Sequence, residues 1–257
     1  MDLRLKGRTA LVTGASKGIG LAVVQTLAAE GVRVAGVARS AVPGAALSIT
    51  ADLSGPEGPA AAVARAREEL GGIDILVNNV GGVRSGIAHG ESFADLTDEH
   101  WQQALDLNLF SAVRTTRAAL PALLEARGVI INVSSIGARF AHPPVEYGAA
   151  KAALTNLSKA LSEELGPRGV RVVTVSPGPT LTENWKGADS MAADLAREAG
   201  VSHAEFLAEL PRQMGIATRR LAEPAETAAL IAFLASPHAA NITGADYFVD
   251  GGVIKTV

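Results

Sequence analysis

The sequence predicts an α/β protein in which a seven-stranded parallel sheet is covered by helices on both faces. The first observation is that short apolar runs alternate with longer segments of helical periodicity along the 257 residues. The second is that these runs are apolar on both faces, as expected for strands of a doubly covered parallel sheet. The third is that neither a linker nor an internal repeat divides the chain, so we interpret residues 1–257 as a single domain.

Each predicted strand is a run of mostly Val, Ile, Leu and Ala bounded by turn residues. Because such runs are short and nearly continuous in apolar residues, they fit strands that are buried on both sides of a sheet. In chain order they are residues 9–14, 32–38, a short run within 46–53, 73–81, 128–135, 169–178 and 245–252.

The predicted helices carry apolar residues at the spacing of one helical face. In the helix that begins near residue 144, the positions of Ala150, Leu154 and Leu161 form a single stripe. The dipeptide Gly166-Pro167 then ends this helix. In chain order the predicted helices are residues 18–30, 59–70, about 98–126, about 144–165 and 224–236.

Two connections depart from the regular alternation. Residues 39–47 are too few and too rich in Pro and Gly to form a full crossover helix. The connection at residues 181–221 is instead unusually long, and it is a segment of mixed polarity after the sixth strand. A long insertion at the carboxyl end of a strand is where an α/β protein commonly keeps the segment that covers its ligand.

The composition excludes several classes of protein. With 48% hydrophobic residues, 19% charged residues, a formal net charge of -3 and no basic run, the chain lacks the signature of a nucleic-acid or membrane-surface binder. It contains no cysteine, which removes disulfides, thiol nucleophiles and thiolate metal sites. Its histidines are scattered without the spacing of zinc ligands, so we expect no metal site; they are His89, His100, His142, His203 and His238.

The chain shows no targeting or membrane segment. Its N-terminus lacks the apolar block of a signal peptide. No stretch approaches the roughly 18 apolar residues of a membrane span. We therefore expect a cytoplasmic protein that has no membrane partner.

The stretch "TGASKGIG", residues 13–20, follows the first predicted strand and opens the first predicted helix. Gly14, Gly18 and Gly20 allow a tight turn and a close approach of backbone to a ligand. The helix N-terminus behind them offers free N–H groups and the positive end of the helix dipole, which suit a pyrophosphate. An ordinary glycine-rich turn would contain similar residues, but the strand–loop–helix context favours dinucleotide binding.

The spacing G-x-x-x-G-x-G of this stretch resembles the short-chain dehydrogenase/reductase family, and the resemblance covers nearly the whole chain. Any one of its motifs is weak, whereas six in the right order on the expected elements are specific. The other matching features are Asn78-Asn79-Val80-Gly81, Asn108 in "LDLNLF", "INVSS" before Tyr147-x-x-x-Lys151, Pro177-Gly178, and "ITGADYFVDGG". The resemblance implies a single doubly wound Rossmann-type domain that binds a nicotinamide cofactor and acts on a small-molecule alcohol or carbonyl compound.

The stretch "VEYGAAKAAL" places Tyr147 and Lys151 four residues apart, on one face of a predicted helix. A cation beside a phenol favours the phenolate and lowers the pKa of the tyrosine from about 10. Tyr147 can therefore serve as a general acid or base toward a carbonyl or hydroxyl group. The resemblance implies that Lys151 also binds the nicotinamide ribose, that a serine orients the substrate oxygen, and that Asn108 anchors a proton-relay water.

Two serines compete for the remaining catalytic role. Counted from the end of the fifth strand, the second serine, Ser135, corresponds to the family's catalytic serine. Counted back thirteen residues from Tyr147, which is the usual spacing in the family, Ser134 corresponds to it. We favour Ser135, because side chains alternate along a strand and a slip of one residue would turn it away from the site. The other serine is then expected to be a structural hydroxyl that bonds to the backbone.

The cofactor is predicted to be NADP(H) in preference to NAD(H). Sites that use NAD commonly place an acid at the end of the second strand, to accept hydrogen bonds from the ribose. Here that position is Ala38, and Arg39 follows it with a permanent charge that suits a 2′-phosphate. The predicted cofactor-binding residues are Gly14, Ser16, Lys17, Gly18, Ile19, Gly20, Arg39, Asp52, Leu53, Asn79, Tyr147, Lys151, Pro177, Gly178, Thr180 and Thr182.

The substrate pocket is expected between the loop after the fourth strand, residues 136–145 and the 181–221 insertion. Its apolar candidates suggest a moderately hydrophobic carbonyl or alcohol, although they could equally pack on the core. The candidates are Arg84, Arg139, Phe140, Trp185, Met191, Phe206 and Met214.

Three alternatives to an NADP(H)-dependent oxidoreductase stay open. They are an NAD(H)-dependent alcohol dehydrogenase, a lyase or epimerase on the same fold, and a catalytically silent nucleotide-sensing protein. The presence of both Tyr147 and Lys151 favours catalysis. The resemblance also implies a homotetramer or homodimer that pairs the two long helices, where Ala149, Ala152, Ala153 and Ala160 would permit close approach.

Overall fold

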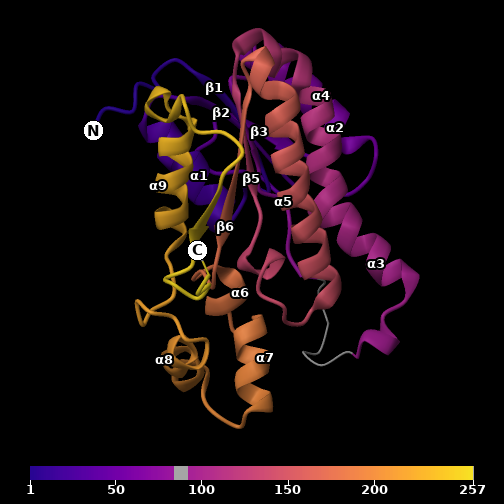
Figure 1. Cartoon of the computed structure of the whole chain (residues 1–257), viewed down its shortest axis with the longest axis vertical. Helices are drawn as coiled ribbons and strands as arrows, with labels where there is room; N and C mark the ends of the chain where they lie inside the picture. Colours follow the sequence, from indigo (N-terminus) through magenta and orange to yellow (C-terminus); the bar gives the residue numbers. More distant parts are fainter. Residues whose placement is uncertain (84–91, 257) are drawn as a thin grey trace.

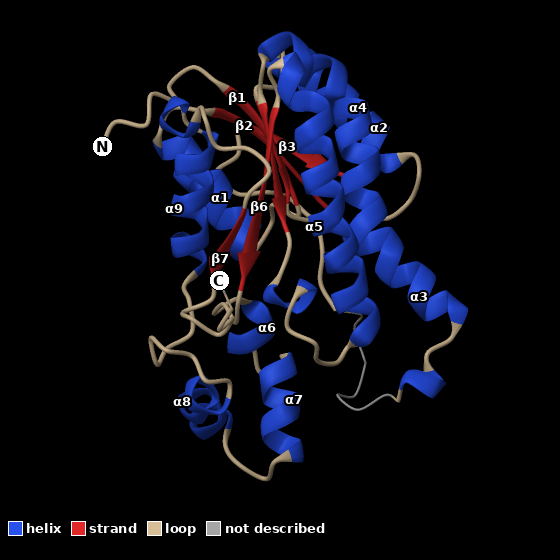
Figure 2. Ribbon diagram, in the orientation of Figure 1, coloured by secondary structure: helices blue, strands red, loops and turns tan. Residues whose placement is uncertain are grey.

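The computed structural model describes residues 1–83 and 92–256. These residues contain the expected seven-stranded sheet, and all of its strands run parallel, in the order β3-β2-β1-β4-β5-β6-β7 (Figures 1 and 2). The order runs outward from β1 in one direction and from β4 in the other. The strands are β1 (Thr9–Thr13), β2 (Arg33–Ala38), β3 (Leu47–Thr50), β4 (Ile75–Asn78), β5 (Val129–Val133), β6 (Arg171–Pro177) and β7 (Asp246–Val249).

Helices cover both faces of this sheet, so the predicted doubly wound fold is confirmed. Figure 1 shows α1 (Gly18–Ala29) and α9 (Pro224–Ala235) packed together on one face. The other face carries α2 (Gly58–Leu70), α4 (Ser111–Ala126) and α5 (Val145–Leu165). Each helix turns small and branched apolar side chains onto the sheet, and burying one large side chain contributes about 1.5–3 kcal/mol. Two apolar cores result, one on each side of the sheet.

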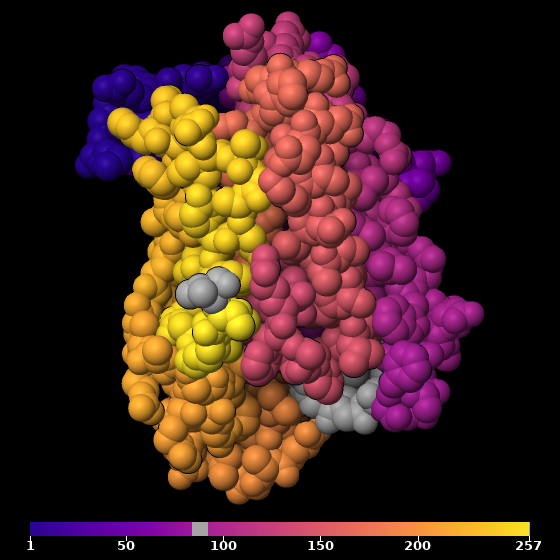
Figure 3. Space-filling model, viewed as in Figure 1, coloured from indigo at the N-terminus to yellow at the C-terminus, as the bar shows by residue number. Residues whose placement is uncertain are grey.

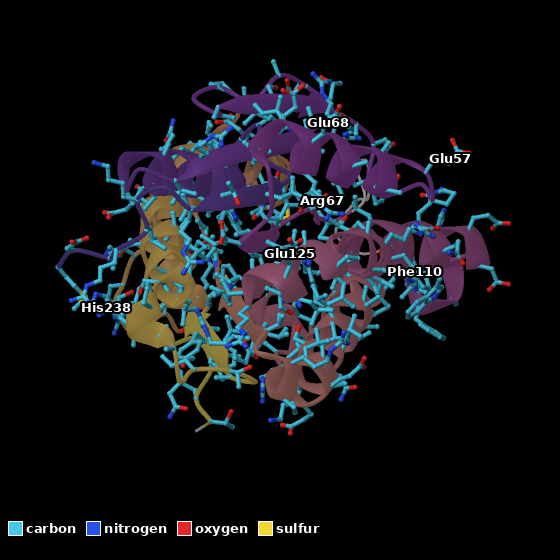
Figure 4. The ribbon with its side chains drawn as sticks, turned by 90° about the horizontal axis from the view of Figure 1, so that it is seen from above. Glu57, Arg67, Glu68, Phe110, Glu125 and His238 are labelled. Atoms are coloured by element: carbon cyan, nitrogen blue, oxygen red, sulfur yellow. The ribbon has the colours of Figure 1, made fainter. Side chains whose placement is uncertain are left out.

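The outer surfaces of these helices are charged. Figure 4 shows Arg67 on α2 facing Glu125 on α4, and their side-chain N and O atoms lie 3.6 Å apart. Both side chains are more than half exposed, so the pair contributes at most about 1 kcal/mol to stability.

The helix predicted over residues 98–126 is interrupted. It consists of α3 (Asp98–Leu105), a π-helical turn η2 (Asp106–Phe110) and α4. Thr97 begins it by accepting a hydrogen bond from the backbone of His100. A π turn is rare and commonly lies at a functional site, and here it carries Asn108.

The insertion at residues 181–221 contains three short helices that the sequence pattern did not predict. They are α6 (Glu183–Lys186), α7 (Met191–Glu198) and α8 (His203–Gln213). Figures 1 and 3 show this segment, in orange, at the end of the molecule toward which the strands point. A third apolar cluster holds it in place, built on Ile136, Leu210, Ile216, Leu221 and Val253.

The remaining connections are short. Residues 39–46 between β2 and β3 form turns, as expected from their Pro and Gly content. Short 3-10 turns lie at η1 (Phe93–Asp95), η3 (Ile136–Ala138), η4 (Gly166–Arg168) and η5 (Pro237–Ala239). Within residues 1–83 and 92–256, no helix is long and apolar enough to cross a membrane, and no group of His, Asp and Glu has the arrangement of a metal site.

Candidate active site

The glycine loop lies at the carboxyl end of β1, where the order of the strands reverses. Such a reversal opens a crevice in which α/β proteins bind their ligands. Gly14 has a φ of 62°, a left-handed conformation that disfavours other residues. A Cβ atom on Gly20 would lie 2.2 Å from the carbonyl oxygen of Gly14, so only glycine fits there.

Asn79, the residue after β4, fixes the shape of this loop. Its side-chain Nδ2 donates to the carbonyl oxygens of Thr13 and Gly14, both at 3.1 Å. The Thr13 hydroxyl in turn accepts hydrogen bonds from the backbone N–H groups of Asn79 and Val80, at 2.9 and 3.2 Å. Thr13 was not predicted as a site residue, because the partners of its hydroxyl lie more than sixty residues away in the sequence.

Helix α1 begins directly after the glycine loop, and the first backbone N–H groups of a helix have no partner within the helix. Lys17 is the N-cap residue, and its side chain makes no capping hydrogen bond. Ser16 lies in the loop, and Gly18 and Ile19 open the helix. Gly18 lies against the methyl group of Thr182, since a Cβ there would come within 3.1 Å of that carbon. The three glycines therefore give the loop the tight turn and close backbone approach that a dinucleotide pyrophosphate requires.

The ends of β2 and β3 form the expected adenosine side of the crevice. Arg39 follows Ala38 at the end of β2 and is exposed. Asp52 accepts hydrogen bonds from the backbone N–H and the hydroxyl of Ser54, and these bonds, together with the nearby Arg39 charge, lower the pKa of its carboxyl group. Leu53 is buried in the core beneath α2. The last residue of β2 is Ala38 and not an acid, and the guanidinium of Arg39 follows it.

The residues after β6 line the opposite side of the crevice. Pro177 ends the strand, and a Cβ on Gly178 would lie 2.8 Å from the Cα of Asp250. Thr180 is buried, and its hydroxyl donates to the Gly178 carbonyl at 2.9 Å. Its hydroxyl is thus already engaged within the chain.

Tyr147, Lys151 and Ser135 come together at the carboxyl end of β5. Lys151 is only 2% exposed, and its Nζ donates to the carbonyl oxygen of Val133 at 2.9 Å. The same Nζ lies 5.9 Å from the centroid of the Tyr147 ring. A Cβ on Gly81 would lie 2.7 Å from Nζ, so this glycine gives the ammonium the room it occupies.

Burial dominates the protonation of both groups. It lowers the pKa of Lys151 to about 8. It also raises the pKa of Tyr147, while a hydrogen-bonding interaction with the Ser135 side chain acts in the opposite direction. The pKa of Tyr147 is therefore raised, opposite to the lowering expected from Lys151, because removal of the phenol from water is the largest influence on it.

The two candidate serines point in different directions. Ser134 is buried, and its hydroxyl bonds to the Lys151 carbonyl oxygen at 3.1 Å and to the Thr155 hydroxyl at 2.8 Å. Ser135 instead lies beside the tyrosine, since a Cβ on Gly137 would be 3.4 Å from both the Ser135 Oγ and the Tyr147 ring. Its Oγ accepts a hydrogen bond from the Gly137 N–H at 3.0 Å. The geometry thus leaves Ser135 facing the phenol.

Asn108 is buried in the π turn and is tied to the loop after β4. Its side chain accepts a hydrogen bond from the Gly82 N–H at 2.9 Å and donates to the Gly82 carbonyl at 3.0 Å. It also donates to the carbonyl oxygen of Ala104 at 3.1 Å. The side chain is therefore committed to holding this loop, and its Oδ1 would lie 2.8 Å from a Cβ on Gly81.

Three of the predicted substrate-pocket residues pack on the third apolar cluster. Trp185, Phe206 and Met214 are partly buried there, and Arg139 pairs with Asp246. Phe140 is 40% exposed, and Met191 begins α7 half-buried. A cavity of about 660 Å³ lies between α8 and residues 219–226, but neither Ser135 nor Tyr147 lines it. Arg84 and His89 lie outside the described residues.

Comparison with known proteins gives consistent matches along the chain. Residues 14–254 match the family model described as enoyl-(acyl carrier protein) reductase. The 3-oxoacyl-(acyl-carrier-protein) reductase FabG of Vibrio cholerae is 36% identical over 266 residues, which cover 98% of this chain and 99% of that protein.

Two solved structures share the fold. L-sorbose reductase from Gluconobacter frateurii, complexed with NADPH and L-sorbose, is 33% identical with a TM-score of 0.90 over 100% of both chains. An NADPH-bound short-chain oxidoreductase from Pseudomonas aeruginosa PAO1, described as having an atypical catalytic centre, is 34% identical with a TM-score of 0.84. The match covers 97% of this chain and 98% of the Pseudomonas chain.

Proposed function

The chain belongs to the short-chain dehydrogenase/reductase family of oxidoreductases, and on that premise we propose that it interconverts a secondary alcohol and a ketone with NADP(H). The observation that carries this proposal is that Tyr147, Lys151 and Ser135 lie together at the carboxyl ends of the strands, where the glycine loop also lies. Two similar proteins are named as reductases of a 3-oxoacyl group and of L-sorbose, and both of these substrates are ketones.

Each of these residues has a separate role in the proposed reaction. In the direction of reduction, Tyr147 donates its phenolic proton to the carbonyl oxygen, and in oxidation it takes the hydroxyl proton back. Ser135 donates a hydrogen bond that orients the substrate oxygen. Lys151 stabilises the phenolate that forms and holds the ribose of the cofactor, and Asn108 shapes the loop beside them. NADP(H), when bound, supplies or accepts the hydride.

We propose that the pyrophosphate binds at Gly14, Ser16, Gly18, Ile19 and Gly20, the loop at the N-terminus of α1. The adenosine end then lies toward Asp52 and Leu53, and Arg39 and Lys17 bind the 2′-phosphate. A guanidinium forms several charge-assisted hydrogen bonds to a phosphate, and no acid at Ala38 opposes it. The nicotinamide side is formed by Asn79, Tyr147, Lys151, Pro177, Gly178, Thr180 and Thr182.

We also propose that the chain is one catalytic domain in which residues 181–221 close over the substrate. The insertion lies at the carboxyl ends of the strands and packs on Ile136, the residue after Ser135. A homotetramer or homodimer formed through α4 and α5 is our proposal for the assembly. The small residues Ala149 and Ala160 lie on the exposed side of α5 and would let helices approach closely.

The experiment is an absorbance screen of cofactor turnover against ketones and alcohols, including L-sorbose and a 3-oxoacyl thioester. We expect NADPH-dependent reduction of at least one ketone, with at least about tenfold tighter binding of NADPH than of NADH, which is ~1.4 kcal/mol. Arg39→Ala should remove this preference while leaving NADH binding unchanged. Tighter NADH binding in the wild type would contradict the cofactor assignment. Binding without turnover on any compound would instead favour a nucleotide-sensing protein.

A further inference from the structure

Arg139 follows the short turn that begins at Ser135. The turn is η3, and Arg139 is the residue that caps its end. The Arg139 Nε donates to the Asp246 Oδ2 at 3.3 Å, and its guanidinium carbon lies 5.5 Å from the centroid of the Phe248 ring. Asp246 and Phe248 belong to β7, which β6 separates from the strand that ends before Ser134. Arg139 thus reaches from the Ser135 turn across β6 to the edge strand.

The acceptor on β7 is itself held rigidly. The Asp246 side chain is only 9% exposed, and its Oδ1 accepts a hydrogen bond from the Ser176 hydroxyl at 2.6 Å. Ser176 lies on β6 and is fully buried. A salt bridge whose carboxylate is already fixed loses less side-chain entropy on forming than one between two free side chains. Arg139 therefore has a defined anchor, although its own side chain is half exposed.

The turn between Ser135 and Arg139 is held together by its own hydrogen bonds. The Ala138 N–H donates to the Ser135 carbonyl at 3.0 Å, and the Arg139 N–H donates to the Ile136 carbonyl at 2.9 Å. Ile136 is buried in the third apolar cluster. Gly137 lies against the Tyr147 ring and supplies the N–H that bonds to the Ser135 hydroxyl. A shift of Arg139 would consequently move the Ser135 hydroxyl relative to the tyrosine.

We propose that Arg139, through Asp246, is a positioning residue that holds the Ser135 hydroxyl against the Tyr147 phenol. The inference rests on the proposed function, in which Ser135 orients the substrate oxygen. The Arg139 side chain touches β7 and acts on the reaction only through the turn. Displacement of a catalytic group by about 1 Å can cost about 10²-fold in rate, so a single anchor at the end of a short turn is sufficient to matter.

The test compares Arg139→Ala in the wild-type chain and in a Ser135→Ala background, with a ketone found active in the screen. In the wild-type chain we expect kcat to fall about tenfold to hundredfold, with KM and the Kd for NADPH within about twofold. In the Ser135→Ala background the same substitution should change kcat less than twofold, because the group it positions is gone. Arg139→Lys, which keeps a cation, should retain most of the activity and provides a second variant if Arg139→Ala folds poorly.

Arg67→Ala is the matched control, since Arg67 is an equally exposed arginine that pairs with Glu125 far from this turn, and it should leave kcat unchanged. If Ser135→Ala lowers kcat but Arg139→Ala does not, the positioning role is wrong and the proposed function stands. A rise in KM confined to carboxylate-bearing ketones would make Arg139 a substrate clamp and also overturn the inference. An equal loss of kcat in both backgrounds would show that Arg139 does not act through Ser135. A Ser135→Ala variant with full activity would overturn both the inference and the catalytic assignment on which it rests.

Discussion

At the scale of single residues, Lys151 combines a proposed catalytic position with a cost in stability. Its ammonium is buried, and its hydrogen bond goes to the neutral carbonyl of Val133. Among the described residues no carboxylate lies within ion-pair distance of it. Burial without an opposite charge explains why its pKa falls to about 8. Active sites commonly keep such destabilising groups because the reaction requires them.

We therefore expect Lys151→Met to abolish turnover and to stabilise the cofactor-free protein at neutral pH. In the unfolded chain this lysine has its ordinary pKa of about 10.4. Between about pH 8 and that pKa, the unfolded chain therefore binds more protons than the folded chain. The free energy of unfolding of the wild type then rises with pH in this window. Relative to Lys151→Met, it should rise by about 2 kcal/mol between about pH 7.5 and about pH 9.5. Urea unfolding of both proteins at the two pH values measures it, and a parallel pH dependence in both would contradict the account.

The two serines give a second expectation at this scale. Ser135→Ala should lower kcat by about 10-fold or more, because it removes the hydroxyl that faces the Tyr147 phenol. Ser134→Ala should instead lower the melting temperature, since the Ser134 hydroxyl bonds to Lys151 and Thr155 within the helix packing. Steady-state kinetics and thermal unfolding of the two variants separate these effects. The opposite order of kcat values would transfer the catalytic role to Ser134.

The sequence was sufficient to propose individual site residues but not their environments. The pairing of Tyr147 with Lys151 follows from four-residue spacing on a helix, which is a local property. The raised pKa of Tyr147 depends on how much water the finished fold removes from the phenol, and no local pattern encodes that. The role of Thr13 depends on a strand more than sixty residues away, and the same is true of the contact between Arg139 and Asp246.

At the scale of elements, the strands and long helices were predictable because their periodicity reflects burial. The seven apolar runs became the seven strands of the sheet, with ends that differ by a few residues. The helices α6, α7 and α8 were missed because they are short, and short helices depend on caps and tertiary contacts more than on periodicity. Ser190 and Ser202 cap two of them, and this signal was present in the sequence. The π turn at Asn108 has no comparable local signature.

The glycine loop provides the prediction at this scale. Gly20→Ala should weaken NADPH binding at least about tenfold, because a Cβ at this position would overlap the Gly14 carbonyl and displace the Asn79 side chain. The control is Gly55→Ala, since a Cβ there would have no atom within 4 Å. Fluorescence titration of both variants with NADPH compares the affinities. Equal affinities would show that the close packing of the loop does not shape the cofactor site.

At the scale of the whole molecule, the segments that carry the proposed site lie together at the carboxyl ends of the strands. The glycine loop, the Ser135 turn and the first turn of α5 all follow the carboxyl ends of parallel strands or lie beside them. The insertion and the C-terminal segment pack together beside these strand ends, in the cluster that contains Ile136, Leu210 and Val253. The site is therefore assembled from segments that are distant in sequence, and only the fold brings them together.

The exposed side of α5 leads to an expectation about assembly. Multi-angle light scattering should give the mass of a tetramer or dimer at micromolar concentration, because Ala149 and Ala160 leave a surface of small side chains. Ala160→Arg should lower the measured mass by inserting a long charged side chain into that interface. A wild-type protein that is a monomer under these conditions would contradict the proposed assembly.

The most direct test of the central claim is the turnover of Tyr147→Phe. This substitution removes the transferable proton and keeps the ring, so the variant should bind NADPH within about threefold of the wild type. Because burial raises the pKa of the phenol, the wild-type tyrosine holds its proton at neutral pH and can donate it to a ketone. The account predicts that kcat for an active ketone falls by about 10²–10⁴-fold in the variant. A variant that binds NADPH normally and keeps more than about a tenth of wild-type turnover would contradict the account.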